Sequence, residues 1–221
     1  MTIRGYIFIG LLIGCASFLP GTAWADVVPI TNASFEVLPA GGLNLGCGTG
    51  CSYNVGSIPG WTITSSGADE GEFRPGPPSN LAYFYSVPDG VTVAYSNGGI
   101  ISQTVEETVQ VGQVYTLSVD LGNRLDGYQN HGSADLLING IRYAATGTEA
   151  APGYWTLWTT RYVGLGADVG QSITIELNAN GAQGDYDNVI LRTPEPTAIL
   201  LMGVMGGVLL ALAGALKLKS A

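Results

Sequence analysis

The chain has 221 residues, of which 46 % are hydrophobic and 11 % are charged, and its formal net charge is −9. This length favours a single domain, and the hydrophobic content excludes a chain that is disordered throughout. An acidic body with few cations also argues against nucleic acid and anionic lipid as partners, because both require clustered basic side chains.

The first 25 residues have the organisation of a secretory signal peptide. Arg4 precedes the apolar stretch GYIFIGLLIGCASFLP, and AWA stands directly before Asp26. We expect a signal helix that directs the chain through the Sec translocon and is cleaved by signal peptidase after Ala25. A second interpretation remains open, because LIGC is similar to the lipobox of bacterial lipoproteins and would make Cys15 a lipidated N-terminus.

Two cysteines, Cys47 and Cys51, lie close together in the segment CGTGC. In an exported protein such a pair is normally oxidised, so we predict a disulfide that closes a short surface loop. By chain entropy this bond would contribute only about 2 kcal/mol. A zinc site or a redox pair is disfavoured by the absence of a nearby histidine and by the spacing.

The body between the two ends predicts strands and turns. In VYTLSVDLG, apolar residues alternate with polar ones, as expected for a strand with one buried face. Asn139-Gly140 separates two such runs and predicts a tight hairpin. We expect further strands at residues 61–64, 81–85, 91–95, 100–105, 154–163, 173–177 and 186–192. Short strands joined by turns rich in Gly, Asn, Asp and Pro predict an all-β antiparallel sandwich over residues 26–192.

Candidate catalytic residues are few. The sole histidine, His131, lies in a polar glycine-rich stretch, and no serine stands in a nucleophile-elbow motif. Asp69, Glu70 and Glu72 cluster in GADEGEF, where we expect a solvated loop. We therefore predict that the chain is not an enzyme.

The last residues, 193–221, combine three features. Pro194, Glu195 and Pro196 form the tripeptide PEP, residues 198–216 are apolar and uncharged, and residues 217–221 carry two lysines. As a helix of about 1.5 Å per residue, the apolar run would span roughly 28 Å, close to the thickness of a bilayer core. The lysines would stay on the cytoplasmic side, with the body outside.

This C-terminus resembles the PEP-CTERM sorting signal of Gram-negative bacteria. The resemblance implies recognition by exosortase and an association with exopolysaccharide and biofilm. We expect an intermediate anchored in the inner membrane by its C-terminal transmembrane helix, and then a mature form at the cell surface or outside the cell. An ordinary membrane anchor is the alternative.

The order of motifs in the body also carries a resemblance. NASFE begins it, IPGWTI, ISQTV and GQVYTLSVDLGNR follow, and YDNVIL closes it. This succession is similar to the galactose-binding-like jelly roll of carbohydrate-binding modules. The resemblance implies a structural calcium ion held by Glu36 and Asp187, with backbone carbonyls as further ligands. Alternatively, these two carboxylates only accept hydrogen bonds from backbone amides.

A sugar-binding surface would use aromatic faces framed by polar side chains. Trp155 and Trp158 are three apart, so they face opposite sides of a regular strand and we expect one to be exposed. Tyr128 and Arg124 lie in a polar loop and are further candidates. We expect an envelope or extracellular-matrix protein whose noncatalytic jelly roll binds exopolysaccharide. The alternatives are a structural or adhesive protein without a sugar site and, more remotely, a glycoside hydrolase.

Overall fold

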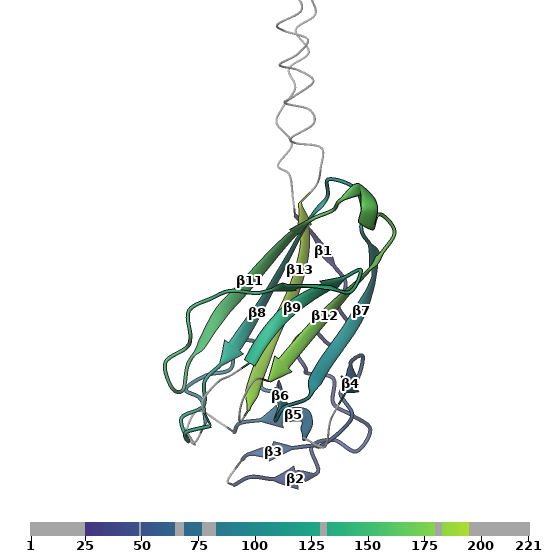
Figure 1. Cartoon of the computed structure of the whole chain (residues 1–221). Helices are drawn as coiled ribbons and strands as arrows, with labels where there is room; N and C mark the ends of the chain where they lie inside the picture. Colours follow the sequence, from purple (N-terminus) through teal and green to yellow (C-terminus); the bar gives the residue numbers. More distant parts are fainter. Residues whose placement is uncertain are drawn as a thin grey trace, which may run out of the picture.

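The computed structural model describes residues 25–48, 50–64, 69–76, 83–128, 132–179 and 183–194. Within them the chain forms two antiparallel sheets packed face to face (Figure 1). The predicted all-β sandwich is therefore confirmed. The signal peptide and the residues after Pro194, including Glu195, Pro196 and the apolar run, lie outside the described residues. Within the described part of the chain, no helix is long and apolar enough to cross a membrane.

The larger sheet has eight strands. In spatial order they are β11 (Trp155–Val163), β8 (Val114–Gly122), β13 (Gly184–Pro194), β6 (Val93–Ser96), β5 (Glu70–Arg74), β3 (Ser52–Tyr53) and β2 (Leu45–Gly46). The remaining strand, β1 (Ala25–Val28), pairs with the end of β13. The first and last described strands therefore lie side by side, at the end of the sandwich far from β2 and β3 (Figure 1).

The smaller sheet has five strands. In spatial order they are β10 (Ile141–Ala144), β9 (Gly132–Ile138), β12 (Ser172–Ala179), β7 (Ile100–Thr108) and β4 (Thr62–Thr64). Asn139 and Gly140, with φ of 50° and 74°, connect β9 to β10 and confirm the predicted hairpin. A short 3-10 helix, η1 (Gly166–Asp168), precedes β12.

Period-two alternation explains the core between the sheets. In β8 the side chains of Tyr115, Leu117, Val119 and Leu121 are fully buried and belong to the main apolar cluster. Strands β12 and β9 supply its opposite side in the same way. Trp61, which directly follows Pro59 and Gly60, is also buried there. A fully buried aliphatic side chain contributes about 1.5–3 kcal/mol, so this layer dominates the stability of the fold.

A second apolar cluster covers the outer face of the larger sheet. It contains Cys51, Phe73, Phe84, Val93 and Tyr95, which are all buried. Cys51 and Phe84, from the segments after β2 and β5, pack over this face together with Arg124, which follows β8. The outer face of this sheet is therefore a second core, and the candidate functional site lies within it.

Two expectations about this region are wrong. Residues 83–85, expected as the end of a strand, are irregular, because Tyr85 donates its amide to Gly153 of another loop instead of to a sheet. Glu70 and Glu72, expected in a solvated loop, belong to β5 and are 2 % and 0 % exposed. Their strand pairs with β6 and β3, and this pairing places both carboxyl groups inside the protein.

Candidate functional site

A pocket of about 300 Å³ opens on the outer face of the larger sheet, within the second apolar cluster. Its walls combine aromatic rings with a few polar groups. The lining residues are Cys47, Tyr53, Asp69, Phe73, Tyr83, Tyr95, Asn97, Arg124, Tyr128 and Gln183. A concave, mostly aromatic pocket with a small number of convergent polar groups is the usual form of a small-molecule site.

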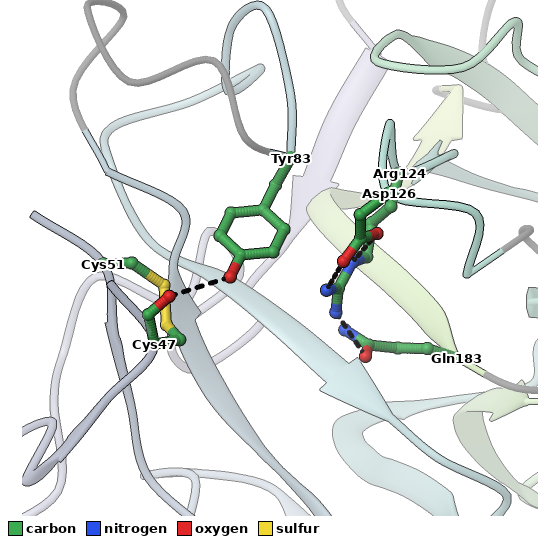
Figure 2. The surroundings of a disulfide bond; sticks show 6 residues. All are labelled: Cys47, Cys51, Tyr83, Arg124, Asp126 and Gln183. Atoms are coloured by element: carbon green, nitrogen blue, oxygen red, sulfur yellow. Dashed lines mark hydrogen bonds and ion pairs between the residues drawn. A yellow bond between two sulfur atoms is a disulfide. The ribbon is translucent and has the colours of Figure 1, made fainter. Parts of the chain in front are cut away.

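Arg124 lines this pocket and is held by its neighbours on several sides. Its guanidinium carbon lies 4.6 Å from the ring centre of Tyr83 and 4.9 Å from that of Tyr128. It forms an ion pair with Asp126 and donates a hydrogen bond of 2.6 Å to Oε1 of Gln183 (Figure 2). A cation stacked on aromatic faces and fixed by two polar partners has little freedom to move.

The disulfide supports the other side of the same pocket. Cys47 and Cys51 are bonded to each other, and the hydroxyl of Tyr83 donates to the carbonyl of Cys47 at 3.0 Å. Figure 2 shows the Tyr83 ring between the disulfide and the Arg124 guanidinium. The short loop thus positions one of the aromatic rings that contact Arg124.

A fully buried carboxyl group, that of Asp185, is connected to this pocket through Gln183, although Asp185 itself is not among the lining residues. Asp185 is opposite Tyr95 of β6 and opposite Gly122 of β8, so the three residues share the outer face of the sheet. One carboxylate oxygen, Oδ1, accepts a hydrogen bond of 2.9 Å from Nε2 of Gln183. The other, Oδ2, is buried and has no hydrogen-bond partner. An unpaired buried oxygen is costly, and the cost is lower for a protonated carboxyl than for a charged carboxylate.

The surroundings of Asp185 favour its protonated form. Burial away from water raises the pKa of this carboxyl to about 7, although the positive charge of Arg124 and the hydrogen bond from Gln183 act in the opposite direction. Arg124, Gln183 and Asp185 therefore form a connected series from the pocket wall to the buried acid. A carboxyl that gains and loses a proton near neutral pH is suited to general acid and base catalysis.

Sequence reasoning missed Asp185, although a signal was present. Asp185 and Asp187 are two apart in a strand and point to the same face of the sheet, between apolar residues that face the core. Two aspartates on the same face of a strand, opposite the apolar face that packs into the core, indicate a polar site on the outer face of the sheet. His131, considered and rejected as a catalytic residue, lies outside the described residues.

Stability should fall as pH rises from about 4 to about 8, because buried carboxyls, among them Glu72, Asp185 and Asp187, keep their protons in the folded state. Burial raises the pKa of both Glu72 and Asp185 to about 7, far above the values near 4 of an unfolded chain. Between about pH 4 and 7 the folded state keeps protons that the unfolded state has lost, so the free energy of unfolding decreases with pH. Each retained proton lowers the free energy of unfolding by about 1.4 kcal/mol per pH unit over this range, and a loss of about 1 kcal/mol corresponds to a Tm drop of roughly 2–4 °C.

The measurement is a thermal melt between pH 5 and pH 8 in the presence of a chelator. The Glu72→Gln, Asp185→Asn double variant should show a flatter dependence on pH than the unmodified protein. A Tm that rises over this interval would contradict the assignment.

The two residues expected to hold calcium converge on one loop. Oε1 of Glu36 accepts the amides of Val91 and Thr92 at 2.7 Å, and Asp187 accepts the amides of Asp89 and Asn188. These contacts correspond to the alternative in which the carboxylates accept backbone hydrogen bonds. Among the described residues, no group of three or more His, Cys, Asp or Glu side chains is placed to hold a metal ion. Calcium binding stays a prediction.

A chelator tests that prediction. If calcium ties the N-terminal segment to β13 through Glu36 and Asp187, removing it with EDTA should lower Tm by several degrees, because binding to the folded state adds stability by mass action. Adding calcium back, but not magnesium, should restore the original value. An unchanged melt would show that backbone amides alone neutralise this pair.

The four candidate sugar-binding residues lie in three places. Arg124 and Tyr128 line the same pocket, and Tyr128 is half exposed with its ring stacked against the guanidinium. Trp155 is partly buried against the second apolar cluster, where its ring packs 4.6 Å from Phe84. Trp158 lies on the opposite face of β11 and packs against the main core. The two tryptophans thus face opposite sides, but both are partly buried.

These features define a class of protein: an antiparallel jelly-roll sandwich with an aromatic pocket on the outer face of one sheet and a buried acid, Asp185, connected to that pocket. Residues 26–192 match the HpiC1-like family, described as HpiC1 cyclase, and the chain belongs to this family. No curated protein sequence matches the chain.

Two solved cyclase structures show the same fold. An apo cyclase from Fischerella sp. is 24 % identical, with a TM-score of 0.64 over 78 % of this chain and 97 % of its own. A cyclase from Fischerella sp. TAU is 22 % identical, with a TM-score of 0.62 over 78 % of this chain and 98 % of its own. A CBM22 tandem domain from Paenibacillus barcinonensis Xyn10C gives a TM-score of 0.49 at 13 % identity, over 79 % of this chain and 48 % of its own.

Family membership corrects one prediction. The chain was expected not to be an enzyme, because its sequence contains no recognisable nucleophile, metal or phosphate motif. The family is one of cyclases, so this prediction is wrong. The error has a physical origin. The residues of the candidate site come from distant parts of the chain, so no short sequence motif marks the buried acid and the aromatic side chains near it.

Proposed function

We propose that this protein is a cyclase that closes a ring within a small, unsaturated and largely apolar molecule. The observation that carries the proposal is the fully buried Asp185 carboxyl, with an unpartnered oxygen, which Gln183 connects to the aromatic pocket. Family membership supports the same reaction class. The volume of the pocket, about 300 Å³, suits a small substrate.

In the proposed mechanism Asp185 acts first as an acid and then as a base. Its proton is transferred to a double bond or carbonyl oxygen of the substrate, which leaves an electron-poor carbon. An internal alkene attacks this carbon and forms the new ring bond, and the carboxylate recovers a proton from the product cation. Atoms and electrons balance within one molecule, so the net reaction is an isomerisation and requires no oxidant or reductant.

The other residues of the pocket would assist in two ways. The rings of Tyr53, Phe73 and Tyr95 would exclude water, which would otherwise capture the cation and give a hydrated product. Gln183 would orient the acid through its hydrogen bond to Oδ1, and Arg124 would keep Gln183 in place. Aromatic faces that Arg124 leaves free would also stabilise a positively charged intermediate.

The experiment uses citronellal, an acyclic unsaturated aldehyde that closes a ring under acid catalysis, together with related acyclic monoterpenoids. Purified protein is incubated with each compound, and products are separated by gas chromatography and mass spectrometry. Ring closure gives a product of unchanged mass with a new retention time. If compounds shown to bind the pocket are recovered only unchanged or hydrated, the proposal is wrong.

We also propose that the protein is exported and trimmed near its C-terminus by exosortase, as the signal peptide and PEP tripeptide suggest. The disulfide between Cys47 and Cys51 supports an oxidising compartment. The intact mass of the extracellular form would end near Thr197 if processing occurs. A full-length tail would favour an ordinary anchor.

A further inference from the structure

A larger cavity, of about 600 Å³, lies near the pocket of the candidate functional site and has no role in the proposed reaction. Much of its lining is apolar or glycine, with side chains from Phe84, Val87 and Val91. Tyr85 and Ser86 add neutral polar groups, and Arg74, at the end of β5, adds a charged one. Among the described residues that line it, Arg74 is the one cation. The cavity is thus an apolar chamber with a single positive group.

Arg74 lacks the partners that an arginine at such a position usually has. Its Nε is shielded from water and has no hydrogen-bond acceptor. The ion pairs found among the described residues involve Arg124 and Arg142, and none involves Arg74. A guanidinium N–H that is shielded from water and has no acceptor costs free energy. The planar guanidinium group of an arginine can donate two parallel hydrogen bonds to one carboxylate.

The two cavities are lined by neighbouring residues of the same chain segments. Phe73 lines the pocket of the candidate functional site, and its neighbour Arg74 lines the larger cavity. In the same way, Tyr83 lines the pocket and Phe84 lines the larger cavity. The disulfide loop also contributes to both, through Cys47 and Gly50. The larger cavity is therefore a separate site with a shared wall.

We propose that this cavity binds a small amphipathic monocarboxylate, with the carboxylate on the Arg74 guanidinium and the apolar body against Phe84, Val87 and Val91. A single cation in an apolar lining favours a singly charged ligand, because a phosphate dianion would require further positive groups to offset its desolvation. The volume is within the range of small-molecule sites. The inference does not depend on the proposed cyclase activity.

Trp155 provides an internal reporter of occupancy. Its ring packs 4.6 Å from Phe84, and its Nε1 donates a hydrogen bond of 2.8 Å to the carbonyl of Ser86. Both Phe84 and Ser86 line the cavity, although Trp155 itself is absent from the lining. A ligand that fills the cavity would alter the environment of this indole and hence its fluorescence.

The experiment titrates purified protein with phenylbutyrate and, separately, with the neutral analogue phenylbutanol. Intrinsic fluorescence and calorimetry report binding, and the Trp155→Phe variant identifies the source of the optical signal. We expect saturable binding of phenylbutyrate and at least tenfold weaker binding of phenylbutanol, since only the carboxylate can pair with the guanidinium.

Substitution of Arg74 completes the test. Arg74→Met should weaken phenylbutyrate at least tenfold and leave phenylbutanol unchanged, whereas Arg74→Lys, which keeps the charge but not the fork, should give an intermediate affinity. Arg161→Met, at an exposed position on β11, is the matched control and should bind as the unmodified protein does. Circular dichroism confirms that each variant is folded. Equal affinity for the acid and the alcohol, no binding of either, or unaltered binding by both Arg74 variants would overturn the proposal.

Discussion

Replacing Asp185 by asparagine should abolish most ring closure while leaving the protein folded. Asparagine keeps the shape of the side chain and can still accept the hydrogen bond from Gln183, but it cannot transfer a proton. General acid catalysis by a positioned group contributes about 10²–10⁴-fold, so turnover should fall within that range. The measurement is the rate of isobaric product formation from a substrate identified with the unmodified protein.

The stability of the Asp185→Asn variant separates a catalytic role from a structural one. A neutral amide replaces a buried group that is partly ionised near pH 7, so Tm at pH 8 should be unchanged or higher. The matched control is Asp69→Asn, because Asp69 lines the same pocket but is exposed to water. Full turnover by Asp185→Asn, or equal loss in the Asp69 variant, would show that the acid lies elsewhere.

The pH dependence of turnover gives a third readout. The reactive form of Asp185 is protonated, and its pKa is raised to about 7. Turnover should therefore be constant in mild acid and decline tenfold per pH unit once the pH exceeds that pKa. This decline should vanish from the residual activity of Asp185→Asn.

The sandwich could be predicted from sequence because it depends on local pattern. Alternation in β8 and β12 sets which side chains face the core, and Asn139-Gly140 sets one hairpin. Strand pairing then follows from the need to bury those faces. The same reasoning fails for residues 83–85, because their backbone hydrogen bonds go to another loop.

The candidate site could not be predicted in this way, because its residues meet only through the fold. Tyr83, Arg124 and Gln183 are separated by about forty to sixty positions, and no spacing rule joins them. From the sequence, Glu70 and Glu72 are expected in a solvated loop because charged side chains are usually exposed to water. Only the pairing of β5 with its neighbours shows that both are enclosed. Buried polar groups at a functional site are the places where sequence rules are expected to fail.

Arg124 is the residue whose loss should affect both the fold and the acid. Its guanidinium is stacked near three rings, those of Phe73, Tyr83 and Tyr128, and only 11 % of its side chain is exposed. Arg124→Met removes these contacts and leaves Oε1 of Gln183 without its donor. We expect the free energy of unfolding to fall by roughly 2–4 kcal/mol, as for other broken buried charge contacts.

The same substitution should also shift the pH dependence of turnover to higher pH, which a general loss of stability would not do. The positive charge of Arg124 lowers the pKa of Asp185, so removing it should raise that pKa above its present value of about 7. The variant should then stay active to a higher pH than the unmodified protein, although it is less stable. Arg124→Lys keeps the charge and should shift the profile less. Arg161→Met, far from the acid on exposed β11, should change neither quantity. A destabilised Arg124→Met variant with an unshifted profile would mean that Arg124 supports the loops only and does not act on the acid.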